Sequence, residues 1–131
     1  MNIRMIIALA VGIILIGGAF WLVSTKHQEG SVDTEIPTAT IVDGNQYVDI
    51  TAKGGYSPRI VIAKAGVKTV LRITTNGTFD CSASVVIPKL SYQKFLQSSG
   101  IAEIPITSEQ ATGTLQGLCS MGMYSFQVRF Q

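Results

Sequence analysis

The most regular hydrophobic pattern of the chain lies at its C-terminal end. Phe126, Val128 and Phe130 alternate with polar residues, which is the two-residue period of a half-buried β-strand. Other short apolar or alternating segments recur from residue 45 onward, and most are separated by turns that contain glycine or proline. Together they predict strands at residues 47–52, 59–63, 67–74, 84–87, 102–106, 114–118 and 124–130.

The region from residue 45 to residue 131 is therefore expected to be all-β. About seven short strands joined by turns are typical of a β-sandwich, and a domain of this size can bury its own core. No segment of this region has the apolar stripe of a long amphipathic helix. The segment SYQKFLQ, residues 91–97, is expected to form a single helical turn.

The N-terminal part has a different pattern. Residues 5–23, MIIALAVGIILIGGAFWLV, carry no charge, and as a helix they would extend about 29 Å, close to the hydrocarbon thickness of a bilayer. The segment predicts a transmembrane anchor at residues 1–24, with Trp21 suited to the membrane interface. A cleaved signal peptide is the alternative, because Gly17 and Ala19 are small enough for a cleavage site.

The charges indicate orientation and partners. Arg4 and the amino terminus favour an N-terminus inside the cell, so the domain after this single span is expected outside the cytoplasm, at the cell membrane. Residues 25–44 are polar and read as a flexible linker. Residues 45–131 carry eight cations and four anions, a net charge of +4. The cations are scattered, so nucleic acid is not an expected partner, and the chain is expected to be a monomer.

The candidate chemistry lies in the sulfur-containing residues. Cys81 and Cys119 are the only cysteines, and Met121 and Met123 follow the second of them at alternate positions. Thiolate and thioether sulfurs are soft ligands that select Cu(I) over hard cations. Zinc seldom takes methionine. A blue copper centre needs two histidines, but the only histidine is His27 in the linker.

The spacing adds a geometric expectation. If residues 119–123 run nearly extended, the three sulfurs of Cys119, Met121 and Met123 point to one side, and Gly122 lets the backbone curve. Cys81 would complete the set if both segments lie in loops at one end of the sandwich. Two Cu(I) ions would neutralise two thiolates, and binding would release protons.

Two other readings stay open at this point. Cys81 and Cys119 could form a disulfide that staples an extracytoplasmic β-sandwich binding module without metal. An enzyme is the third reading. It is disfavoured because no second histidine exists for a triad or a redox copper, Asp80 reads as a turn residue, and Tyr124 as a packing residue.

The sulfur motif resembles a known family. CSMGMY at residues 119–124, with Cys81 upstream and GGYSPRIVIAKAG at residues 54–66, is similar to the cupredoxin-like domain of membrane-anchored bacterial copper chaperones of the CupA type. The resemblance implies a Greek-key cupredoxin fold and a site for two Cu(I) ions. In that site Cys81 and Cys119 bridge the metals, while Met121 and Met123 cap them. It also implies copper transfer to the metal-binding domain of a copper-exporting P-type ATPase, in copper resistance.

Overall fold

The structure is a computed structural model that describes residues 3–4, 7 and 36–131. The predicted linker up to residue 35, its His27, and nearly all of the predicted membrane anchor lie outside these residues. Within the described part of the chain, no helix is long and apolar enough to cross a membrane. The compact C-terminal unit begins at Ile36.

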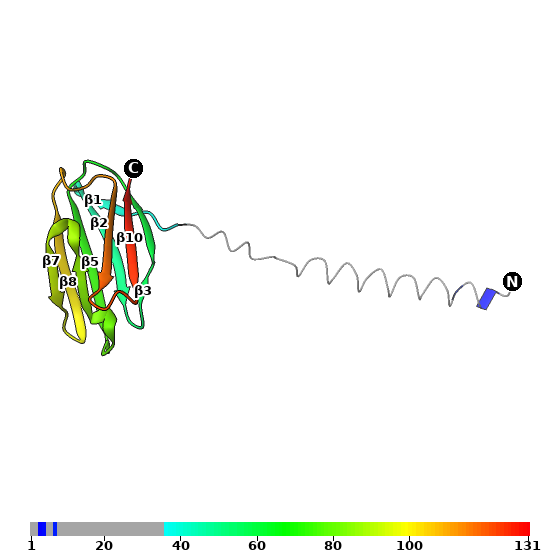
Figure 1. The fold of residues 1–131 in the computed structure, drawn as a ribbon. Helices are drawn as coiled ribbons and strands as arrows, with labels where there is room; N and C mark the ends of the chain where they lie inside the picture. The colour runs from blue at the N-terminus through cyan, green and yellow to red at the C-terminus, as the bar shows by residue number, and fades with distance from the viewer. Residues whose placement is uncertain (1–2, 5–6, 8–35) are drawn as a thin grey trace. The chain divides into compact units, whose positions relative to one another are not determined.

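This unit is a sandwich of two five-stranded sheets, as the sequence predicted (Figure 1). The first sheet has the order β1-β2-β5-β8, and β3 pairs with the C-terminal end of β2. The second sheet has the order β4-β10-β9-β6-β7. β2 pairs with β5 and β4 with β10 in parallel, and the other pairs are antiparallel. The strands are β1 (Thr40–Val42), β2 (Asn45–Ala52), β3 (Tyr56–Ser57), β4 (Ile60–Ala63), β5 (Thr69–Asn76), β6 (Ser84–Ile87), β7 (Tyr92–Phe95), β8 (Ser99–Ile106), β9 (Thr114–Cys119) and β10 (Ser125–Phe130).

The core lies between the sheets and follows the predicted alternation. In β10 the residues Phe126, Val128 and Phe130 are buried, while the residues between them are partly exposed. β2 and β5 contribute alternate aliphatic residues from the other sheet, such as Ile50 and Leu71. The seven predicted strands are all present, with bounds that shift by at most three residues.

The helical turn expected at residues 91–97 is wrong. A single 3₁₀ turn, η2 (Pro88–Leu90), precedes this segment, and residues 92–95 form β7, which pairs with β6. Ser91 adopts a left-handed conformation, with φ of 51°, and reverses the chain so that Tyr92 pairs with Ile87. The pairing with β7 satisfies backbone N–H and carbonyl groups of β6, which would have no hydrogen-bond partner if residues 92–95 formed a helical turn.

Two short strands were also missed. β1 lies in the segment that the sequence assigned to the linker, and its three residues are exposed. The chain before it already contacts the sandwich, because the Ala39 N–H donates to the Ile62 carbonyl at 2.8 Å. β3 has only two residues and is too short to show a period.

Several loops gather at the end of the sandwich away from the C-terminus (Figure 1). β2 ends here and turns into β3, β9 ends at Cys119, and β10 begins at Ser125. The segment after β5 reaches the same end through η1 (Cys81–Ala83), which leads into β6. The topology therefore brings residues 53–57, 77–83 and 119–124 together.

Candidate metal centre

Cys119 is the buried member of the sulfur set. It is the last residue of β9, opposite Val85 of β6, and its side chain is 0% exposed within the core cluster. Its backbone N–H donates to the Tyr124 carbonyl at 3.0 Å, so β9 and β10 remain tied together around the intervening loop. Cys119 is therefore fixed by both sheet pairing and packing.

Cys81 comes from a distant part of the sequence and is the first residue of η1. Asp80 holds this turn, since its carboxylate accepts hydrogen bonds from the Ser82 N–H at 2.8 Å and from the Gly54 N–H at 2.9 Å. The hydrogen bonds from Ser82, and then the one from Gly54, lower the pKa of Asp80. Asp80 is thus a turn residue that ties the Cys81 loop to the loop after β2.

The two cysteines meet. Both are free and Cys81 is half-buried. Interaction with the Cys119 thiol, followed by burial, raises the pKa of Cys81, so the two thiols lie close together. For Cys119, burial is the largest single effect and raises the pKa. Its interaction with the Cys81 thiol and the hydrogen bonds from backbone N–H groups together outweigh burial, so the pKa of Cys119 is lowered. The two thiols therefore titrate as an interacting pair rather than independently.

The loop after Cys119 differs from the extended segment that the sequence predicted. It is a tight turn, because the Gly122 N–H donates to the Cys119 carbonyl at 2.8 Å and Gly122 has φ of +71°. Only glycine adopts this left-handed backbone without strain. The turn directs the N–H of Tyr124 at the Cys119 sulfur, at 3.4 Å.

The two methionines lie at the solvent side of this turn. Met121 is 75% and Met123 is 65% exposed. Met123 also borders a cleft of about 440 Å³, whose wall includes Tyr56, Tyr124 and the cations Lys53 and Arg59. The sulfur set therefore runs from the buried Cys119 through the half-buried Cys81 to two exposed thioethers.

Two neighbouring residues escaped the sequence analysis. Tyr56, in β3, is 5% exposed, and its hydroxyl is buried without a hydrogen-bond partner among the described residues. Phe79 is 86% exposed although it precedes Asp80 and Cys81 directly. Phe79 could have been singled out from the sequence, because it lies two residues before the candidate ligand Cys81. Tyr56 could not, because its position depends on the pairing of β3 with β2.

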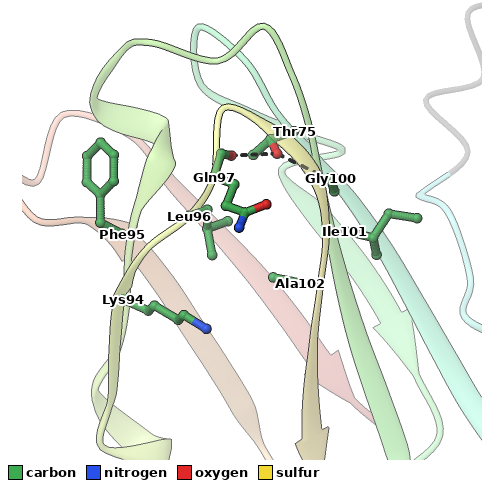
Figure 2. Close-up of a pocket in the computed structure, with 8 residues that line it drawn as sticks. All are labelled: Thr75, Lys94, Phe95, Leu96, Gln97, Gly100, Ile101 and Ala102. Carbon is green, nitrogen blue, oxygen red and sulfur yellow. Dashed lines mark hydrogen bonds between the residues drawn. The ribbon is translucent and has the colours of Figure 1, made fainter.

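A second cavity, of about 270 Å³, lies between β7 and β8 and contains no sulfur (Figure 2). At one end of it the Thr75 hydroxyl shares its proton between the carbonyls of Gln97, at 2.8 Å, and Gly100, at 3.3 Å.

Across the described residues, no three side chains of histidine, cysteine, aspartate or glutamate are grouped closely enough to hold a metal ion. The candidate centre is therefore the pair of Cys81 and Cys119 together with the turn that carries Met121 and Met123.

Comparison with known proteins identifies the class. The family model of the cupredoxin-like domain matches residues 12–129, so the chain belongs to the cupredoxin-like domain family. Its all-β sandwich is accordingly a cupredoxin-like fold. No curated protein matches the chain in sequence.

Two solved structures are similar to this chain in fold. One is the metal-binding domain of the Streptococcus pneumoniae D39 Cu(I)-exporting P-type ATPase CopA with Cu(I). It is 20% identical, has a TM-score of 0.65, and the match covers 75% of this chain and 97% of that one. The other is a copper-binding protein in its apo form, which is 22% identical with a TM-score of 0.66 over 73% of this chain and 97% of that one.

Proposed function

We propose that this protein is a Cu(I) chaperone of the CupA type, which binds copper through Cys81, Cys119, Met121 and Met123. One observation carries the proposal: two free cysteines from distant parts of the sequence meet beside two exposed thioethers. These four donors are all soft, as Cu(I) requires, and they offer nothing that suits a hard cation. The likeness to two copper-binding domains supports the choice of metal.

Electrostatics favours two copper ions. One Cu(I) on two thiolates leaves a net charge of −1, whereas two leave the cluster neutral. Because Cys119 is buried, an uncompensated charge at its sulfur would be costly. Bridging thiolates of Cys81 and Cys119, with one thioether on each metal, would give a neutral cluster that needs no other protein charge.

The exposure of the ligands suits transfer rather than storage. Met121 and Met123 face solvent, so a thiolate of another protein can approach the copper from that side and replace a thioether, which is the weaker ligand. The buried Cys119 would release the metal last. This exchange needs no acid, base or redox step, so we propose no enzymatic activity.

We further propose that the acceptor is the metal-binding domain of a copper-exporting P-type ATPase, and that the transfer serves copper resistance. One of the structures that share this fold is such a domain. An N-terminal membrane anchor would keep both proteins at the same membrane and raise the effective concentration for their encounter.

The ligand assignment can be tested with the full-length chain. Cu(I) is titrated under reducing conditions against a chromophoric chelator, in the wild type and in Cys81→Ser, Cys119→Ser and the double variant Met121→Leu/Met123→Leu. Leucine keeps the apolar volume of methionine but removes the thioether. Ser120→Ala is the matched control, because Ser120 lies in the same turn, is exposed and carries no sulfur.

Each cysteine variant should lose roughly 100-fold or more in Cu(I) affinity, which is at least the effect of removing a group outside the ligand shell. The methionine variant should lose less and, because no thioether has to be displaced, should release copper to an acceptor at least as fast as the wild type, while the Ser120 variant should match the wild type. Unchanged affinity in either cysteine variant would contradict the assignment. Thiol alkylation with mass measurement, before and after reduction, identifies any oxidised fraction that would mimic a disulfide-stapled module.

A further inference from the structure

Tyr56 is the one described residue whose buried side-chain polar group has no hydrogen-bond partner. The residue is only 5% exposed, so bulk water does not supply the missing hydrogen-bond partner. A buried donor without a partner destabilises a fold, and phenylalanine would avoid that cost in the same volume. Tyr56 therefore needs an explanation that contacts within the described part of the chain do not supply.

Packing fixes the direction of this hydroxyl. The ring of Tyr56 meets the ring of Phe126 edge to face, with centroids 5.0 Å apart and an interplanar angle of 71°. Phe126 is itself buried and lies across Gly117 of the neighbouring strand. Both aromatic rings belong to the core cluster, so Tyr56 cannot turn its hydroxyl out to solvent without breaking this contact.

The Tyr56 ring packs on Phe126, which lies opposite Gly117, and Gly117 shares the buried face of β9 with Cys119. Burial raises the pKa of Tyr56, and negative charges at Cys119, Cys81 and Asp80 raise it further, in that order. A phenol near these sulfurs is thus held in its protonated form, in which it can donate a hydrogen bond. Cys119 is the fully buried one of these three groups, whereas Cys81 and Asp80 are partly exposed.

We infer that Tyr56 is a positioning residue of the metal centre, whose hydroxyl donates a hydrogen bond to the Cys119 sulfur when Cu(I) is bound. The inference rests on the proposed function, since it assigns the group that supports the thiolate ligand from outside the ligand set. Such a bond spreads the charge of the ligand and fixes its orientation. Outer groups of this kind commonly contribute 10- to 100-fold to metal affinity.

The test is Tyr56→Phe, which removes one oxygen atom and leaves the packed ring. In the metal-free protein this change removes only an unpaired group, so the melting temperature should stay equal or rise. Cu(I) affinity, measured by chelator competition in the full-length chain, should fall by roughly 10- to 100-fold. A residue with only a packing role would change both quantities in the same direction or neither.

Tyr92→Phe is the matched control. Tyr92 is a half-buried tyrosine that packs against the same core, but it pairs with Ile87 at the end of β6 away from Cys119. Its variant should bind Cu(I) like the wild type. Nuclear magnetic resonance adds a direct readout, because the hydroxyl proton of Tyr56 should exchange slowly with solvent and shift when Cu(I) is added.

The outcomes separate this inference from the proposed function. If the wild type binds Cu(I) through Cys81 and Cys119 but Tyr56→Phe binds it equally well, the role of Tyr56 is refuted and the chaperone remains. A fall in affinity together with an equal loss of metal-free stability also refutes it. If the wild type does not bind Cu(I), both proposals fail.

Discussion

Gly117→Ala should destabilise the domain through a single atom. Gly117 lies in β9 directly opposite Phe126 of β10. A Cβ atom at this position would lie 2.1 Å from Cζ of Phe126, 2.2 Å from Cε1 and 2.8 Å from Cε2. Carbon atoms in contact are separated by about 3.5 to 4.0 Å, so the end of the ring would have to move by about 1.5 Å.

The ring has no free space to move into. Phe126 is 1% exposed, and its ring is held against Tyr56. Overpacking of this kind typically costs about 1 to 3 kcal/mol. Because 1 kcal/mol shifts the melting temperature of a small domain by roughly 4 to 8 °C, the variant should melt roughly 5 to 20 °C below the wild type.

Urea unfolding of the full-length chain, followed by circular dichroism, measures the free-energy change. The double variant Gly117→Ala/Phe126→Leu is the control, because a leucine is shorter than the ring and leaves space for the new methyl group. The two changes should therefore be coupled, and the double variant should be more stable than the sum of the single effects predicts. A free energy of unfolding within about 0.5 kcal/mol of the wild type for Gly117→Ala, or strict additivity, would refute the argument.

Two further predictions concern copper itself. Because the pKa of Cys81 is raised above that of an ordinary thiol, Cys81 is protonated at neutral pH and must release a proton when Cu(I) binds. Chelator competition should show the affinity falling as the pH is lowered from about 8 to about 6, and a flat profile would contradict thiolate ligation. Phe79→Ser should leave the Cu(I) affinity and the stability unchanged, since the side chain is 86% exposed. Because this exposed aromatic ring lies two residues before Cys81, the change should slow transfer to the metal-binding domain of a copper-exporting P-type ATPase. Stopped-flow mixing measures the rate, and an unchanged rate would show that Phe79 does not contact the acceptor.

The sequence revealed the sandwich because burial imposes a two-residue period on most of its strands. The alternation at Phe126, Val128 and Phe130 could be read directly, and β6 has the predicted bounds, residues 84–87. β7 could not be read in this way. It pairs at the edge of the second sheet and exposes three of its four residues, so it has no alternating pattern.

The four candidate ligands could be named from residue type, but the shape of the loop that carries three of them could not be predicted. Soft donors can be recognised from residue type alone, and a sandwich with loops at one end predicted that Cys81 approaches Cys119. The turn at residues 119–123 was missed because it depends on one backbone hydrogen bond that Gly122 permits. Tyr56 lies next to the site because the two residues of β3 pair with the end of β2. A strand of two residues is too short to produce a periodic pattern in the sequence.

X-ray absorption of the full-length, reduced chain loaded with Cu(I) tests the central claim most directly, with the metal-to-protein ratio measured on the same sample. The account predicts two copper ions per chain, with sulfur as the only kind of neighbouring ligand atom and a short distance between the metals. A nitrogen or oxygen ligand that persists in the loaded protein, or copper that binds equally after Cys81 and Cys119 are alkylated, would contradict it.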